Sequence, residues 1–160
     1  MSSADRPSSP PYVGALLRPC WQWVRDQIYA GVAAEGYDDL NAAHVALFRY
    51  PGLDRQRPSE LAEQLQITRQ SINDLLGHLE RCGYVTRQAD AADGRARVVR
   101  LTAKGRRLQT AITRHARAAE DHIAELLGPR RFSQLRDTLQ ELAHRLTDNR
   151  PTPTLDRAKT

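Results

Sequence analysis

Hydrophobic positions recur at helical spacing over most of the chain. Between residues 11 and 35 the apolar residues lie four, three, four and four positions apart: Leu17, Trp21, Val24, Ile28 and Val32. Such a stripe predicts an amphipathic helix. Pro19 lies within it, so either the helix bends there or its regular part begins at that residue. A shorter helix is predicted over 41–50, with Asn41 as its N-cap.

Two more short helices are predicted close together over 59–82. Ser59 and Thr68 are their expected N-caps, and Gly83 supplies a left-handed end to the second. In the second helix the apolar residues share one face: Ile72, Leu75, Leu76 and Leu79. The opposite face carries the polar residues and a glycine: Arg69, Gln70, Asn73, Asp74, Gly77 and His78. Two short helices joined by so few residues are typical of a helix-turn-helix.

The pattern then changes to strands and returns to helices. Residues 84–87 and 97–101 are rich in β-branched side chains and flank an Asp93-Gly94 turn, which predicts a β-hairpin with a long charged tip. Long helices are predicted over 103–127, with Thr102 as the N-cap, and over 129–149. In the last one the apolar residues form a narrow seam suited to a partner helix: Leu135, Leu139, Leu142 and Leu146. The predicted fold is therefore mainly α with a small β-hairpin wing.

The distribution of charge along the chain indicates a class of binding partner. The 160 residues carry a net charge of +5, and residues 55–107 alone hold 11 Lys and Arg against 6 Asp and Glu. A local basic excess favours nucleic acid or an anionic surface, with a merely solvated face as the alternative. The sequence has no run of eighteen apolar residues and no apolar segment at its start, so we expect a cytoplasmic protein without membrane association.

The order helix, helix, hairpin indicates how DNA would be bound. The second helix of such a module enters the major groove, and an arginine at the hairpin tip enters the neighbouring minor groove. Asp93 is suitably spaced to hold the Arg95 guanidinium. The predicted DNA-contacting residues are Ser59, Thr68, Arg69, Gln70, Ser71, Asn73, His78, Asp93, Arg95 and Arg97.

Residues 58–65, 79–85 and 93–105 resemble the winged helix-turn-helix of MarR-type transcriptional regulators, including the Leu101-Thr102-x-x-Gly105 motif. One departure is Gly94, where many members carry an arginine. The resemblance implies a homodimer that represses transcription from a pseudo-palindromic site with half-sites about 10 bp apart. It divides the chain into a flexible arm (1–10), a helical dimerisation region (11–40 and 103–149), a DNA-binding domain (41–102) and a flexible tail (150–160).

The same resemblance implies an effector pocket, often for an aromatic acid or phenol. Its expected lining is Arg18, Trp21, Arg25, His44 and Phe48. Cys20 lies near the position of the reactive cysteine in peroxide-sensing members. We favour a small buried hydrophobe there, with a redox switch through Cys20 as the alternative.

Catalytic and metal-binding motifs are absent from the sequence. It has no Gly-rich phosphate loop, no His-Glu-x-x-His and no nucleophile elbow, so we expect neither an enzyme nor a cofactor. His115 and His122 are seven positions apart, and the i, i+4 pair of a helical zinc site is missing, so no metal is expected. Two alternatives remain. One is a zinc-sensing role for His115 and His122 together with His44, and the other is a winged-helix module that contacts proteins instead of DNA.

Overall fold

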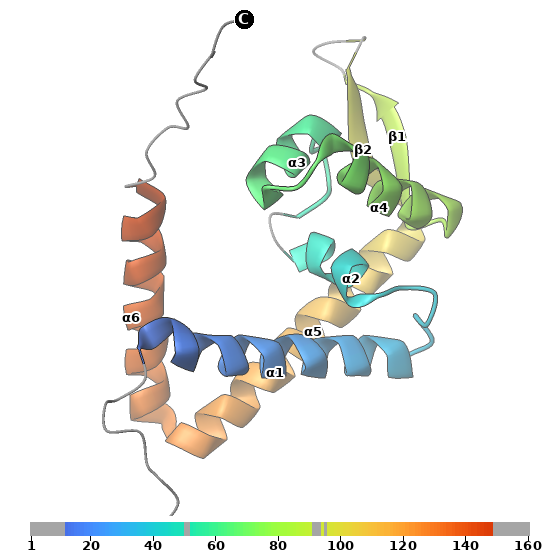
Figure 1. The fold of residues 1–160 in the computed structure, drawn as a ribbon. Coiled ribbons are helices and arrows are strands. Elements are labelled where there is room, and N and C mark those ends of the chain that lie inside the picture. Colours follow the sequence, from blue (N-terminus) through green and yellow to red (C-terminus); the bar gives the residue numbers. More distant parts are fainter. Residues whose placement is uncertain (1–11, 50–51, 91–93, 95, 149–160) are drawn as a thin grey trace, which may run out of the picture. The chain divides into compact units, whose positions relative to one another are not determined.

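The computed structural model describes residues 12–49, 52–90, 94 and 96–148 (Figure 1). These residues form, in chain order, α1 (Val13–Ala34), α2 (Ala42–Arg49), α3 (Pro58–Leu65), α4 (Arg69–Arg81), β1 (Val85–Ala89), β2 (Arg97–Leu101), α5 (Ala103–Leu127) and α6 (Pro129–Asp148). The predicted class, mainly α with a β-hairpin, is confirmed. The predicted arm and tail lie outside the described residues. The chain divides into two compact units after Ala119, and each is described by itself.

Helix α1 is continuous through its proline. It begins at Val13, six residues before Pro19, so the regular part does not start at the proline. Burial is confined to the C-terminal part of the helix, where Ile28 and Val32 are almost completely enclosed. The first half instead exposes Leu17 and Trp21 to solvent. The N-terminal part of the apolar stripe predicted for this helix is therefore uncovered in the single chain.

Side-chain caps fix where the short helices begin. Asn41 caps α2, because its Oδ1 accepts from the His44 backbone N–H at 3.0 Å, and Thr68 caps α4 in the same way through Ser71. Both caps confirm the prediction. The prediction that Ser59 caps α3 is wrong: the helix begins one residue earlier, at Pro58. Proline suits the first helical turn, and the Glu60 carboxylate accepts from the backbone N–H of Arg57, the residue before Pro58, at 3.1 Å.

The hairpin is an antiparallel ladder. Val85 pairs with Leu101 at its base and Ala89 pairs with Arg97 toward its tip. The segment before α3 adds to the free edge of β2, since the Arg55 N–H donates to the Val99 carbonyl at 2.8 Å. Buried Val85, Val99 and Leu101 hold the base of the hairpin on the core.

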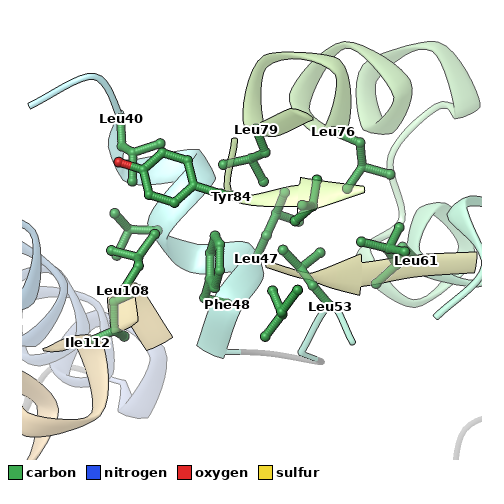
Figure 2. Packing of buried hydrophobic residues seen from close by; sticks show 14 of the residues in the cluster. Leu40, Leu47, Phe48, Leu53, Leu61, Leu76, Leu79, Tyr84, Leu108 and Ile112 are labelled. Carbon is green, nitrogen blue, oxygen red and sulfur yellow. The ribbon is translucent and has the colours of Figure 1, made fainter. Parts of the chain in front are cut away.

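One apolar core joins these elements within the first unit (Figure 2). Leu61 comes from α3, Leu76 from α4 and Leu108 from α5, and each side chain is completely buried. Tyr84, between α4 and β1, lies edge-on to Phe48 of α2 with their ring centroids 6.4 Å apart. The hairpin and α4 are therefore fixed to the same core that receives α5.

The start of α5 is tied to the end of α4 through Thr102. Its backbone N–H and its Oγ1 both donate to the Tyr84 carbonyl, at 3.0 and 3.1 Å. The Oγ1 also accepts from the Gly105 N–H, which caps α5 as the sequence predicts. Thr102 and Gly105 of the Leu-Thr-x-x-Gly motif thus set where the hairpin ends and the long helix begins.

The second unit begins at Glu120 and contains the end of α5 and all of α6. Helix α6 has no buried residue. Its four seam leucines, Leu135, Leu139, Leu142 and Leu146, are 40, 39, 39 and 62% exposed. The apolar side of this helix is therefore uncovered in the single chain.

Candidate nucleic-acid interface

The N-terminus of α4 is built to stay exposed and ordered. Thr68 Oγ1 accepts from the Ser71 N–H at 3.0 Å and lies 2.8 Å from the Ser71 hydroxyl. This cap satisfies one of the backbone donors that a helix start leaves unpaired. Ile72, Leu76 and Leu79 face the core and hold the helix down. The first turn thus stands at the surface on a rigid base.

The exposed face of α4 presents predicted DNA-contacting residues. Arg69, Gln70, Ser71 and Asn73 are all exposed. The Gln70 amide donates to Asp74 Oδ1 at 2.8 Å, while the Asn73 amide donates to the Arg69 carbonyl at 2.8 Å. Arginine and glutamine are the residue types that recognise guanine and adenine edges. This face is chemically suited to the major groove.

His78 lies elsewhere than the sequence analysis placed it. The imidazole is half-buried and stacks on the buried His44 ring, with centroids 4.3 Å apart and the planes 14° from parallel. Its Nε2 is 2.6 Å from the Asp39 carbonyl oxygen. The helix places position 78 toward α2 rather than on the outward face, so the expectation of an outward-facing, DNA-contacting His78 is corrected.

Asp39 connects this polar cluster to α5. Its carboxylate accepts from the Tyr84 hydroxyl at 2.6 Å and from Lys104 Nζ at 3.3 Å. Burial opposes the charged form, but these two donors outweigh it and hold the pKa of Asp39 below its usual value. Burial and the bond to Asp39 raise the pKa of Tyr84 above the usual range. The cluster anchors the loop after α1 against the end of α4.

The tip of the wing is only partly described. Asp93 and Arg95 lie outside the described residues, and Arg97 is exposed at the start of β2. Ser59, in the first turn of α3, is also exposed. The structure therefore places Ser59, Arg97 and the face of α4 at the surface of the winged domain.

Further arginines gather between α3 and the hairpin, and none of them was among the predicted DNA-contacting residues. Arg57 forms an ion pair with Asp90, and Arg100 NH1 lies 3.8 Å from Asp54 Oδ2. Together with Arg55 they line a hollow of about 530 Å³ between α3 and the hairpin. The charge excess over residues 55–107 was the sequence signal for these residues, but their convergence depends on the tertiary fold.

The predicted effector residues do not come together as one lining. His44 and Phe48 are 6 and 3% exposed and belong to the interior of the winged domain, so they offer no open surface. Trp21 is 54% exposed, and the Arg49 guanidinium lies over its ring at 5.2 Å from the centroid. The sequence analysis missed Arg49. No spacing in the sequence signals this contact, because Arg49 and Trp21 lie on different helices that the fold brings together.

Arg18 and Arg25, the other two predicted effector residues, are exposed on α1. The Arg25 guanidinium pairs with the adjacent Asp26 at 3.0 Å. Cys20 is exposed as well, so the interpretation as a small buried hydrophobe is wrong. Cys20 lies in the N-terminal half of α1, where no residue is buried.

The described residues have neither a metal-binding cluster nor a membrane-spanning helix. No group of three His, Cys, Asp or Glu side chains in that part of the chain is arranged to hold a metal ion. His115 instead bonds to Glu35, and His122 Nδ1 lies 4.0 Å from Glu125 Oε2. No described helix has the length and apolarity needed to span a membrane.

A winged helix-turn-helix with a polar, arginine-bearing surface is the class that this geometry defines. The model of the MarR family matches residues 40–96. The chain is 35% identical over 134 residues to the HTH-type transcriptional repressor Rv2887 of Mycobacterium tuberculosis, covering 79% of this chain and 87% of that protein. It is 36% identical over 84 residues to the HTH-type transcriptional regulator FarR of Neisseria gonorrhoeae, spanning 52% of this chain and 58% of that regulator.

Solved structures agree. The crystal structure of Rv2887 in complex with salicylic acid aligns with a TM-score of 0.62 at 28% identity, covering 84% of this chain and 98% of that one. A crystal structure of MarR aligns with a TM-score of 0.73 at 22% identity, covering 91 and 97%, and shows the shared fold. The chain belongs to the MarR family of transcriptional regulators.

Proposed function

We propose that this regulator is a cytoplasmic homodimeric repressor that binds a pseudo-palindromic promoter site and is released by a small aromatic acid. The observation that carries the proposal is the rigid, capped start of α4, which exposes Arg69 and Gln70 beside the arginine-bearing hairpin. Arg69 and Gln70 contact base edges in the major groove of DNA, and Arg97 contacts the adjacent DNA phosphate backbone or the minor groove. The predicted DNA contacts of Asp93 and Arg95, which lie outside the described residues, remain part of this proposal.

The remaining predicted contacts keep supporting roles in this proposal. Ser59 lies in the first turn of α3, where an exposed hydroxyl suits a phosphate. Thr68 and Ser71 are engaged in the cap, so their contribution is to present the helix N-terminus, which itself favours an anionic phosphate oxygen. These contacts position the protein, and the base contacts give the sequence preference.

The uncovered apolar sides of α1 and α6 support a homodimer. A seam of four leucines, 39–62% exposed, is costly to leave in water, since burying one leucine side chain contributes roughly 1.5–3 kcal/mol. A second copy of the chain supplies an equivalent surface, and a two-fold interface is the commonest solution for a soluble protein. Two winged domains related by such an axis require half-sites about 10 bp apart.

The pair formed by Trp21 and Arg49 supports an aromatic acid as effector. A half-exposed indole offers a stacking face, and the guanidinium 5.2 Å from its centroid offers a charge for a carboxylate. Arg18 and Arg25 add positive charge on the same helix as Trp21. The structure of the relative Rv2887 contains salicylic acid. We propose that such a ligand stabilises a spacing of the two recognition helices that no longer fits the operator.

Selection from random DNA duplexes tests the sequence preference. The full chain should enrich a two-fold symmetric motif and bind it about 10³-fold or more tightly than a scrambled duplex near physiological salt. Salicylate should weaken that complex in the wild type and have less effect on Trp21→Ala. If the protein instead binds selected and scrambled duplexes equally, the winged domain serves protein contacts rather than operator recognition.

A further inference from the structure

We propose that Arg87 of β1 sets the base preference of α4 by holding the Asn73 side chain in an orientation that cannot pair with adenine. This inference rests on the proposed DNA-binding function. It assigns a positioning role to a residue of the hairpin that neither the sequence analysis nor the proposed function uses. It also changes the role expected of Asn73, which the sequence analysis placed among the residues that contact bases.

Arg87 binds the middle of α4 at two points. Its NH1 donates to Asn73 Oδ1 at 3.1 Å, and its NH2 donates to the Asn73 backbone carbonyl at 3.2 Å. The guanidinium is a planar fork with fixed donor directions, so two bonds to one residue fix that residue's side chain as well as its backbone. The Asn73 amide is further held by its own donation to the Arg69 carbonyl at 2.8 Å.

Glu80 fixes Arg87 in turn. The Glu80 carboxylate accepts from the Arg87 backbone N–H at 3.2 Å and lies 3.5 Å from the Arg87 Nε. The Arg87 side chain is only 26% exposed, between β1 and α4. Strand β1 is therefore connected to α4 at two places, seven residues apart along the helix. A shift of the hairpin would move the Asn73 side chain with it.

This arrangement already engages the amide oxygen and one amide proton of Asn73, the groups that asparagine uses to recognise adenine. The specific pairing needs the amide oxygen to accept from adenine N6 while the amide nitrogen donates to N7. Here the oxygen already accepts from a cation, and one of the two amide protons is directed to a backbone carbonyl. Gln70 differs, because its bond goes to the exposed side chain of Asp74 on the same surface and can exchange for a base.

The consequence is a division of roles on one helix face. Arg69 and Gln70 recognise bases, and Asn73 with Arg87 forms a fixed polar wall beside them. If Arg87 is removed, the Asn73 amide is freed at its oxygen and gains a preference of its own. A purely structural tie would instead lower affinity for every duplex together and leave the order of preference unchanged.

The test compares four full-length proteins on a panel of duplexes in which each base pair of the selected operator is changed in turn. The proteins are the wild type, Asn73→Ala, Arg87→Ala and the double variant Arg87→Ala/Asn73→Ala. Binding is measured by fluorescence anisotropy. Asn73→Ala should keep the wild-type order of preference. Arg87→Ala should gain about tenfold for adenine at one position in each half-site, and the double variant should lose that gain.

The outcomes separate this inference from the proposed function. A wild type without sequence preference contradicts the proposed function itself. If the wild type has a sequence preference and Arg87→Ala shows the same order of preference at a uniformly changed affinity, the positioning role is overturned. An altered preference in Asn73→Ala alone also overturns it, because Asn73 then recognises a base with Arg87 in place. If Arg87→Ala fails to fold, the order of preference of Asn73→Ala still tests the inference. Arg87→Lys keeps the charge but lacks the planar fork, and it should show a smaller gain in affinity for adenine at the same position.

Discussion

Gly105 lies where α5 passes closest to the backbone at the end of α4, and alanine at this position tests that packing. A Cβ built on Gly105 would lie 2.1 Å from the Tyr84 carbonyl oxygen, whereas real Cβ contacts under 3.0 Å are essentially never seen. Both atoms belong to rigid segments, so one of the two backbones must move by about 0.9 Å. Such overpacking costs roughly 1–3 kcal/mol, and sometimes more.

Two further contributions set the net effect. Alanine is favoured over glycine in a helix interior by about 1 kcal/mol, which opposes the loss. The shift also strains the bonds from Thr102 to the Tyr84 carbonyl, each contributing about 1 kcal/mol. We therefore expect Gly105→Ala to lower the free energy of unfolding by about 2 kcal/mol, and to weaken DNA binding because the hairpin moves relative to α4.

Gly77→Ala is the matched control. It is also a helical glycine, but its added Cβ would meet only the side-chain ends of Arg81, at 3.4 Å, and Arg87, at 3.9 Å, both ordinary van der Waals distances. The helix preference is then unopposed, and stability should rise by up to about 1 kcal/mol. Urea unfolding followed by circular dichroism measures both variants at one protein concentration. If Gly105→Ala proves as stable as the wild type, the close approach of α5 to Tyr84 is not what fixes the hairpin.

Three further predictions concern His44, the leucine seam of α6 and the wing. His44 accepts from the Asn41 N–H, and burial together with the nearby His78 holds the pKa of His44 below its ordinary value. As the pH falls, the unfolded chain therefore takes up a proton at this position before the folded protein does. The free energy of unfolding should decrease as the pH drops below about 6.5, and decrease less in His44→Gln, which urea midpoints at pH 7.5 and 5.5 will measure. Leu139→Asp should yield a monomer or an unfolded chain by sedimentation, whereas Gln140→Asp, with the same charge one position along α6, should remain a dimer. Arg95→Ala should weaken operator binding by roughly 1–3 kcal/mol with an unchanged melting temperature, and undiminished affinity at moderate salt would count against a wing that contacts DNA.

Local chemistry explains what the sequence could predict. The correctly predicted features depend on residues within one helical turn of each other. They are the helices, the N-caps Asn41, Thr68 and Thr102, and the left-handed Gly83. The one cap that was wrong, Ser59, competed with a neighbour only one residue away. A proline that fits the first turn and a glutamate three residues after Arg57 moved the helix start.

The site was harder to predict because its contacts span distant parts of the chain. Arg87 bonds to Asn73 across 14 positions, and His78 reaches the Asp39 carbonyl across 39. Helical spacing places His78 on a polar face, but only the packing of α2 shows that this side of the helix is covered. Arg49 over Trp21 has the same origin, since two helices bring together residues that no spacing rule connects.

The central claim is that two copies of this chain recognise one symmetric DNA site. Sedimentation equilibrium of the full protein with the selected duplex, and with a scrambled duplex of equal length, measures stoichiometry and preference together at near-physiological salt. We expect a free protein of twice the 18.0 kDa chain mass and a complex of two chains per selected duplex, with no comparable complex on the scrambled one. A single chain on each duplex, or equal binding to both duplexes, would contradict it.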